Sequence, residues 1–423
     1  MKVLIVGSGG REHALCWSFN KSKRVKKIFC ANGNQGIAET AECVDIIPND
    51  IKGLRKFVTQ NNIDLTFVGS ENPLALGIVD EFEKHGLKII GATQTASQLE
   101  SSKSFAKDFM SRYDIPTAKY KIANTTDEAV NILESGIFGD ENAPVVVKAD
   151  GLAAGKGVIV AANYSEAKKA INELAQTVGK TAAQKIVLEE CLIGEEVSVL
   201  LFADGKNFAL MPPCRDHKRI GEGDTGANTG GMGTITDAAL LSEQQIKQIT
   251  KTVIEPTLKG TTAEGFPFVG ILFLGLMMTK DGIKVLEYNV RFGDPETQVI
   301  LVRLKTELLD ICEAISTQTL SQLNIEWEEG SSACVILASK GYPQKPVTGD
   351  IIYGLDKLKG IQDLNVFHSG TSKDKNGNCI TSGGRVLGIT AKGENLDYAL
   401  NNVYQAVNEI NWNGMQYRRD IGK

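Results

Sequence analysis

The sequence contains few of the residues on which metal and nucleophilic active sites most often depend. Its four histidines, at positions 13, 85, 217 and 368, are scattered and form no ligand pair. The eight cysteines are far apart and include no Cys-x-x-Cys pair, which predicts reduced, buried thiols instead of disulfides or a zinc site. No Ser-His-Asp set or Cys-His pair stands out either. These absences argue against nucleophilic and zinc chemistry.

An excess of positive charge and long apolar runs are absent as well. The formal net charge of -5 gives no general attraction to nucleic acid or to an anionic membrane. No apolar run approaches the roughly 20 residues that span a bilayer, and the first residues are typical of a strand entering a glycine turn, not of a signal peptide. We therefore expect a cytoplasmic protein without nucleic-acid or membrane partners. At 423 residues the chain should form two to four domains.

The first hundred residues alternate strand and helix patterns, which predicts a doubly wound parallel sheet with ligands at the carboxyl ends of its strands. Gly7-Ser-Gly9-Gly10-Arg11-Glu12 opens the first helix. It is not a dinucleotide fingerprint, because Glu12 replaces the third glycine and no acid follows the second strand. The free amides of such a turn favour a substrate phosphate or another small polar group, and a purely structural turn is the alternative.

A glycine-rich loop, Asp150 to Gly157, lies between two runs rich in β-branched residues. This pattern predicts a hairpin and not the strand-loop-helix of a P-loop, which would also need a Ser or Thr after the lysine. The glycines allow backbone amides to approach phosphate oxygens, while Lys148 and Lys156 supply charge. A hairpin tip with solvated lysines is the alternative. Further on, the acidic end of the strand that closes with Glu189 and Glu190 could serve as an adenine and ribose hinge, or be an ordinary exposed turn.

Residues 215 to 233 contain too much glycine to predict a packed element, so we expect a long binding loop there. The strand that follows, Lys284 to Val290, places Glu287, Asn289 and Arg291 on one face because side chains two residues apart share a side. A carboxylate and an amide oxygen suit Mg²⁺, and Arg291 offers a fixed fork of donors to an anion. The alternative is a solvated strand. After Asp294 and Pro295 we expect a helix through Ile311.

ATP accounts for these features together, and phosphoryl transfer needs little covalent help from the protein. The chain resembles the ATP-grasp superfamily and, within it, the phosphoribosylamine–glycine ligase family. The motifs that carry the resemblance are Val-Gly-Ser-Gly-Gly-Arg-Glu-His-Ala14, Lys148 to Gly157, Asp216-His-Lys-Arg219, Thr229 to Gly233, and Arg291-Phe-Gly-Asp-Pro-Glu296-Thr-Gln298. The resemblance extends over essentially the whole chain. It implies an N-terminal α/β domain (1–101), an ATP-grasp domain (102–327) with a lid subdomain at about 122–188, and a C-terminal α+β domain (328–423).

The resemblance also implies a reaction in which ATP, glycine and 5-phosphoribosylamine give glycinamide ribonucleotide, ADP and phosphate through glycyl phosphate. Glu287 and Asn289 would bind Mg²⁺ or Mn²⁺, and Arg291 and Asp216 would be catalytic. ATP would contact Lys103, Lys148, Gly151, Gly155, Lys156, Gly157, Glu189, Glu190, Leu192 and Glu195. The acceptor substrates would contact Gly9, Gly10, Glu71, Asp216, Asn228, Arg291, Gly293 and Asp294. A monomer is expected.

The sequence departs from the pattern of this family in several places, among them Arg215 and Ala227, where Gln and Pro are commoner. Gly69-Ser-Glu-Asn-Pro73 replaces the more usual Gly-Pro-Glu-Ala-Pro, and residues 272 to 278 offer no acid for a second metal ion. Three other functions compete with the ligase. They are an ATP-grasp ligase that activates bicarbonate or another carboxylate, a nicotinamide-dependent oxidoreductase built on the first domain, and an ATP-binding regulatory protein without turnover.

Overall fold

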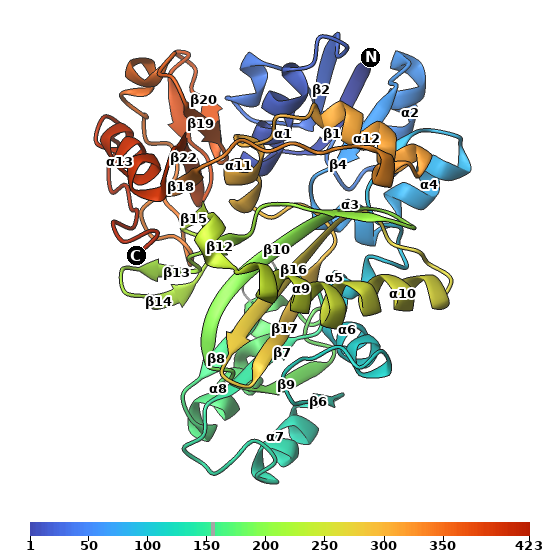
Figure 1. Cartoon of the computed structure of the whole chain (residues 1–423). Helices are drawn as coiled ribbons and strands as arrows, with labels where there is room; N and C mark the ends of the chain where they lie inside the picture. Colours follow the sequence, from blue (N-terminus) through green and yellow to red (C-terminus); the bar gives the residue numbers. More distant parts are fainter. Residues whose placement is uncertain (154–156) are drawn as a thin grey trace.

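The computed structural model describes residues 1–153 and 157–423, and in these ranges the chain begins with a parallel sheet of order β3-β2-β1-β4-β5 (Figure 1). Val3 to Val6 of the central strand are fully buried, because both faces of the sheet are covered. The doubly wound sheet predicted for the N-terminal part is thus confirmed. Its elements are β1(Lys2–Gly7), α1(Gly10–Asn20), β2(Lys27–Asn32), β3(Glu42–Val44), α2(Ile51–Asn61), β4(Leu65–Val68), α3(Glu71–Ala75), α4(Ile78–Lys84) and β5(Ile89–Ile90).

A second, smaller sheet projects from the molecule and is called the lid sheet below; it is antiparallel, with the order β6-β9-β7-β8. The predicted hairpin is confirmed, because β7 and β8 pair with Val145 opposite Ala161 and Lys148 opposite Val158. The lid sheet has its own apolar core against two helices. The elements are β6(Tyr120–Ala123), α7(Thr126–Glu134), β7(Val145–Ala149), β8(Val158–Ala161), α8(Tyr164–Val178) and β9(Ile186–Glu190), preceded by α5(Gln98–Ser101) and α6(Lys103–Arg112).

The largest sheet is antiparallel and has the order β17-β16-β10-β12-β15-β18-β22-β19, with β11 beside β10. It continues through the predicted boundary at residue 327, since Thr234 of β15 lies opposite Cys334 of β18. The central and C-terminal parts of the chain therefore share one hydrogen-bonded layer. Its strands are β10(Gly194–Asp204), β11(Phe208–Leu210), β12(Cys214–Asp216), β15(Gly233–Thr236), β16(Val269–Thr279), β17(Gly282–Asn289), β18(Ser331–Ala338), β19(Leu364–His368) and β22(Arg385–Gly393).

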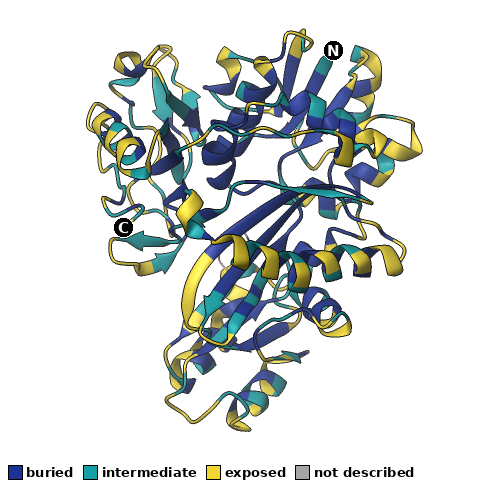
Figure 2. Ribbon diagram, in the orientation of Figure 1, coloured by how far each residue is buried: buried dark blue, intermediate teal, exposed yellow. Residues whose placement is uncertain are grey.

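Helices and small hairpins complete the molecule around these sheets. Figure 2 shows buried strands at the centre and exposed residues along the outer faces of the helices α10 and α13. Within the described ranges, no helix is both long enough and apolar enough to cross a membrane. Apart from short 3₁₀ helices, the remaining elements of the described ranges are β13(Arg219–Gly221), β14(Thr225–Asn228), α9(Glu243–Ile249), the π-helical η3(Thr250–Ile254), α10(Glu255–Ala263), α11(Glu296–Leu301), α12(Leu308–Thr317), β20(Thr371–Lys373), β21(Cys379–Thr381) and α13(Leu396–Val407).

Two predictions about local structure are wrong. The glycine-rich residues 215–233 are not one long loop, because they contribute β12 and β15 to the large sheet and form the β13–β14 hairpin between them. The helix expected from residue 295 through Ile311 stops at Leu301 and a new one starts at Leu308. The interruption lets Arg303 turn inward and donate to the Glu328 carbonyl, with Nη2 at 3.1 Å.

Candidate active site

The strand β17 places a carboxylate and an amide on one face, as its alternation predicts. Glu287 lies opposite Gly275 and Asn289 opposite Phe273 of β16, although a bulge interrupts the register just before Glu287. A Cβ atom at position 275 would lie 3.1 Å from Cγ of Glu287, so the glycine makes room for this side chain. The Asn289 Oδ1 atom accepts a hydrogen bond of 3.0 Å from Arg291 Nη2. The three predicted side chains therefore do come together.

Lysines from three separate segments surround Glu287. Lys218 Nζ lies 3.5 Å from its Oε1 atom, and Lys148 Nζ donates to the neighbouring Leu286 carbonyl at 3.2 Å. Partial burial alone would raise the pKa of Glu287, but Lys218, Lys148 and Lys103 outweigh it and lower the pKa to about 2. The carboxylate is consequently an anion at any physiological pH.

A buried ion network lies behind Lys148. The Glu189 carboxylate is 2% exposed and pairs with Lys148 Nζ at 2.8 Å and with Lys107 Nζ at 3.0 Å. Lys107 also donates to Thr117 Oγ1 at 2.7 Å. The sequence predicts Glu189 near adenine and ribose. In the structure its carboxylate holds Lys148, one of the lysines predicted to bind phosphate. Lys107 was missed, because a lysine in an amphipathic helix gives no sign of being buried.

Lys103 begins α6, whose first turn is tied to the end of the glycine hairpin. The Lys103 amide donates to the Asp150 carbonyl at 3.0 Å, and the Ser104 amide donates to Asp150 Oδ1 at 2.6 Å. Burial lowers the pKa of Lys103, and the nearby Glu287 partly offsets this effect. The hairpin and the lysine are therefore placed by one residue, Asp150, through its carbonyl and its carboxylate.

The other residues predicted to contact ATP have varied surroundings. Glu190 binds the residue before β6, because its Oε1 atom accepts a hydrogen bond from the Lys119 amide at 2.7 Å. Glu195 forms an exposed ion pair with Arg215. Leu192 is half-buried in the connection between β9 and β10. Gly151 and Gly157 mark the two ends of the hairpin loop, whereas the predicted Gly155 and Lys156 lie outside the described residues.

Arg291 points away from the lysines, toward carboxylates of the N-terminal part of the chain. Its Nη2 atom lies 2.6 Å from Glu100 Oε1, and its Nε atom lies 3.5 Å from Glu71 Oε2. Glu100 also accepts the Val290 amide at 2.8 Å, which ties α5 to the end of β17. Burial raises the pKa of Glu100, with Arg291 opposing it, while Arg291 and Arg11 outweigh burial and lower that of Glu71. Glu100 was missed because only the tertiary fold brings it to Arg291.

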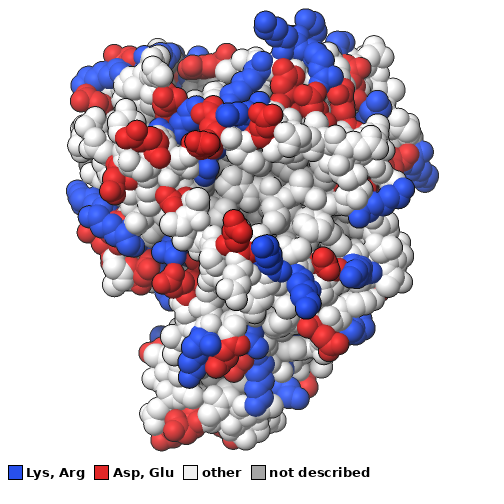
Figure 3. Space-filling view, in the orientation of Figure 1, with Lys and Arg blue, Asp and Glu red and all other residues white. Residues whose placement is uncertain are grey.

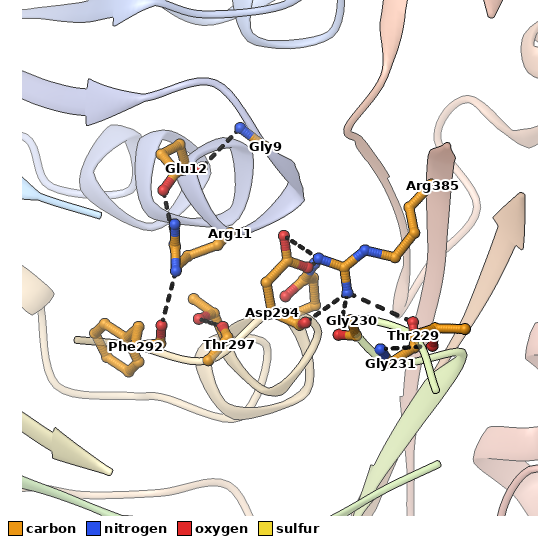
Figure 4. Close-up of polar contacts among 12 residues, drawn as sticks. Gly9, Arg11, Glu12, Thr229, Gly230, Gly231, Phe292, Asp294, Thr297 and Arg385 are labelled. Carbon is orange, nitrogen blue, oxygen red and sulfur yellow. Dashed lines mark hydrogen bonds and ion pairs between the residues drawn. The ribbon is translucent and has the colours of Figure 1, made fainter. Parts of the chain in front are cut away.

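The turn Gly7–Gly10 is filled by Glu12, the residue that excludes a dinucleotide fingerprint (Figure 4). Glu12 Oε2 accepts from the Gly9 amide at 2.7 Å, and its Oε1 atom pairs with Arg11 Nε at 2.7 Å. Any Cβ atom at Gly7 or Gly69 would overlap the Glu12 side chain. The glycines of both turns thus accommodate a buried carboxylate.

The loop that leaves β17 meets this turn. A Cβ atom at Gly9 would lie 3.3 Å from Asp294 Oδ2, and one at Gly10 would lie 2.7 Å from Gln298 Nε2, which itself donates to Asp294 Oδ1 at 2.8 Å. Burial would raise the pKa of Asp294, but Arg385 and Arg11 outweigh it and lower the pKa. Gly293 leaves space for the Glu296 side chain. Predicted residues from distant motifs are therefore neighbours.

Asp216 and Asn228 lie on the large sheet and on the β13–β14 hairpin, respectively. Asp216 accepts from Thr234 Oγ1 at 3.2 Å, and burial together with Glu296 raises its pKa well above the ordinary value. Asn228 pairs with Arg219 across the hairpin. Arg418, near the C-terminus, holds this hairpin. Its Nη1 atom lies 2.6 Å from Asp224 Oδ1 and donates a hydrogen bond to the Arg219 carbonyl at 3.2 Å.

Charge on the surface around these residues is mixed. On the face shown in Figure 3, acidic and basic side chains are interspersed, and neither sign covers a continuous area.

Models of one protein family match the chain in three consecutive parts. The N domain of phosphoribosylglycinamide synthetase matches residues 1–100, its ATP-grasp (A) domain matches 101–297, and its C domain matches 332–423. The chain is also similar to curated proteins called phosphoribosylamine–glycine ligase. It is 44% identical over 422 residues to the protein of Caldanaerobacter subterraneus subsp. tengcongensis, covering 100% of this chain and 99% of the relative. It is 46% identical over 428 residues to that of Vibrio vulnificus, covering 100% and 98%.

Solved structures are similar over nearly the whole chain. The crystal structure of phosphoribosylamine–glycine ligase from Thermotoga maritima has a TM-score of 0.82 at 31% identity and covers 99% of this chain and 100% of its own. The biotin carboxylase domain of Hydrogenobacter thermophilus 2-oxoglutarate carboxylase, solved with MgADP and bicarbonate, has a TM-score of 0.75 at 17% identity and covers 98% and 91%. The second similarity concerns the fold alone.

Proposed function

The chain belongs to the phosphoribosylglycinamide synthetase family, as its motifs predict, and from this premise we propose how its residues divide the reaction between them. The protein is an ATP-dependent ligase. It joins glycine to 5-phosphoribosylamine and gives glycinamide ribonucleotide, ADP and phosphate, a step of purine biosynthesis.

Glu287 and Asn289 fit a divalent cation of the magnesium class, Mg²⁺ or Mn²⁺. Both offer oxygen atoms, Glu287 is ionised, and the two lie on one face of β17. When bound, the ion neutralises charge on the phosphate oxygens of ATP. Lys103, Lys148 and the glycine hairpin from Gly151 to Gly157 hold the same phosphates, with Glu189 keeping Lys148 in place. Glu190, Leu192 and Glu195 form the hinge at adenine and ribose.

The first chemical step activates glycine. A glycine carboxylate oxygen attacks the γ-phosphorus of ATP, ADP leaves, and glycyl phosphate forms. The carboxylate becomes a competent electrophile only when one of its oxygens is part of a phosphate leaving group. Lysines around the γ-phosphate stabilise the charge that develops in this step. Closure of the lid sheet keeps water from hydrolysing the intermediate.

The second step takes place at the Arg291 and Asp294 side of the site. The amine of phosphoribosylamine attacks the carbonyl carbon of glycyl phosphate and the new C–N bond forms. Phosphate leaves with the bonding electrons and takes up the proton that the nitrogen loses. Arg291 orients the acyl phosphate, and Asp216, which accepts a hydrogen bond from Thr234 and packs against Gly231, positions the reacting groups beside it. Gly9, Gly10, Glu71, Asn228, Gly293 and Asp294 line the acceptor.

One observation carries this proposal: an ionised Glu287 beside Asn289, with lysines from α6, β7 and the end of β12 converging on it. The direct test is coupled ADP release with freshly generated phosphoribosylamine, leaving out glycine, phosphoribosylamine or Mg²⁺ in turn. Each omission should abolish turnover. ADP release that depends on bicarbonate instead of glycine would contradict the proposal.

We also propose the partners, cellular location, oligomeric state and domain boundaries of the enzyme. The protein acts on small molecules only, as a cytoplasmic monomer, and it is organised in the domains 1–101, 102–327 and 328–423. Sedimentation at several protein concentrations tests the monomer, because self-association would shift the measured mass with concentration. Limited proteolysis tests the boundaries, which should be cut before the domain interiors.

A further inference from the structure

Arg385, the first residue of β22, extends a guanidinium group from the C-terminal part of the chain into the site (Figure 4). Its Nη1 atom donates to the Asp294 carbonyl at 2.6 Å and lies within hydrogen-bond distance of the Gly230 and Gly231 carbonyls. Its Nη2 atom lies 3.3 Å from Asp294 Oδ2. All these described contacts go to two segments: one contains Asp294, which we assign to the acceptor substrates, and the other follows Asn228 and packs against Asp216.

The first of these segments, Thr229 to Gly231, is packed between Arg385 and Asp216. A Cβ atom at Gly230 would lie 3.1 Å from Cζ of Arg385, and one at Gly231 would lie 2.7 Å from Asp216 Oδ1. The Gly230 amide donates to the Tyr342 hydroxyl at 3.1 Å, which adds a second contact from the C-terminal part. A shift of this segment would therefore displace the surroundings of Asp216.

The second segment leads from Asp294 to the N-terminal helix α1. Asp294 Oδ2 lies against the Gly9 turn, and Gln298 holds its other oxygen. Because Arg385 and Arg11 flank this carboxylate and lower its pKa, it is an anion with an arginine on each side. Arg385 thus links three distant parts of the sequence at one carboxylate.

We infer that Arg385 is a positioning residue for the half-reaction that consumes phosphoribosylamine, and this inference rests on the function proposed above. The guanidinium acts through Asp294 and the Thr229–Gly231 segment, whereas Glu287 and Lys148 are held by other residues. A fork of several donors is needed, because one group must satisfy carbonyl oxygens of two segments together with a carboxylate. A lysine would supply the charge without this geometry.

Steady-state kinetics of Arg385→Gln and Arg385→Lys test the inference, with the KM values for ATP and phosphoribosylamine measured separately. Since small misplacements of reacting groups can cost on the order of 10²-fold, kcat/KM for phosphoribosylamine should fall by about 10²-fold in Arg385→Gln and by less in Arg385→Lys. The KM for ATP should stay at the wild-type value. If Arg385→Gln does not fold, Arg385→Lys provides the same separation of the two KM values.

Arg303 offers a control, because it is a buried arginine whose guanidinium also donates to a backbone carbonyl, that of Glu328, away from the two acceptor segments. Arg303→Gln should lower the melting temperature without separating the two KM values. An unchanged kcat/KM for phosphoribosylamine in Arg385→Gln, or an equal loss for ATP, would overturn the inference. A wild-type enzyme that forms no glycinamide ribonucleotide would instead contradict the proposed function, so the two failures can be distinguished.

Discussion

The two ends of the site differ in how their charges are balanced. At the nucleotide end, four lysines, at positions 103, 107, 148 and 218, face the glutamates 189, 196 and 287. At the acceptor end, the arginines 11, 291 and 385 face four carboxylates, those of residues 12, 71, 100 and 294. The nucleotide end therefore uses lysines, whose flexible ammonium groups can follow a polyanion, while the acceptor end uses arginines that its own carboxylates hold in place.

This difference indicates what each end contributes to catalysis. Lysine ammonium groups are flexible point charges that can rearrange around a triphosphate when the ligand arrives. A network of paired arginines gains little from an added anion, but it holds its members in fixed positions before any substrate binds. We therefore expect substitutions at the nucleotide end to affect phosphoryl transfer itself, and those at the acceptor end to affect the capture of phosphoribosylamine.

The largest effect is expected from Glu287→Gln and Asn289→Ala, which remove the oxygen pair at the nucleotide end. With the charge on the transferring phosphate left uncompensated, kcat should fall by at least about 10³-fold. ADP release measured against Mg²⁺ concentration checks this prediction. Circular dichroism should show an intact fold, and Glu243→Gln, at an exposed position of α9, should behave as wild type. Wild-type activity in both site variants would refute the metal assignment.

Glu100→Gln tests the acceptor end, because it weakens the ion pair that holds Arg291. We expect kcat/KM for phosphoribosylamine or glycine to fall by about 10- to 100-fold, as for other residues that orient a functional side chain, with the KM for ATP unchanged. Initial rates with each substrate varied in turn measure the effect. A raised KM for ATP alone would show that the two ends are not separate in function.

Glu189→Gln removes the carboxylate that holds Lys107 and Lys148 at the nucleotide end, and we expect a smaller effect on ATP binding than that of the preceding variants on turnover. Two buried lysines lose their shared carboxylate, so opening of the lid sheet should become easier by about 3 kcal/mol, and the KM for ATP should rise about tenfold. Hydrogen exchange of amides in β7 and β9, together with the KM for ATP, provides the measurement. Protection equal to that of the wild type would show that the network contributes nothing to the placement of Lys148.

The smallest effect concerns the contact between the N-terminal and C-terminal parts, on which the acceptor end depends. The His368 amide donates to His13 Nδ1 at 2.8 Å, and burial lowers the pKa of His13 to about 3 and that of His368 to about 4. The unfolded chain takes up these protons first, below an unfolded pKa of about 6.5, so stability from the neutral rings is complete above that pH and is lost progressively toward pH 4.

His13→Asn keeps an acceptor at this position but removes one titrating ring. Its melting temperature should therefore decline less steeply than that of the wild type between about pH 6.5 and pH 4, the window set by these pKa values. Differential scanning calorimetry across this range measures both slopes. Parallel slopes would mean that His13 titrates alike in the folded and unfolded chains.

Local sequence patterns predicted the parts of the site that lie within one element. The alternation of β17 predicted that Glu287, Asn289 and Arg291 share a face, and the paired runs around the glycine loop predicted the β7–β8 hairpin. The prediction of a long loop at residues 215–233 failed because a glycine-rich segment pairs well when neighbouring strands satisfy its backbone, and composition alone does not reveal such partners.

The order of the elements, the family and the oxygen pair on β17 can be predicted without a structure, because they depend on the spacing of side chains along one strand and on motifs of consecutive residues. Which charged side chains form ion pairs depends on the folded structure. Glu100 and Arg291 are 191 positions apart in the numbering, and Arg385 reaches Asp294 from another strand of the large sheet. Ion pairs across such separations require the whole core to be folded, since the loop-closure entropy they cost is offset by burial of the sheets and not by the pairs themselves.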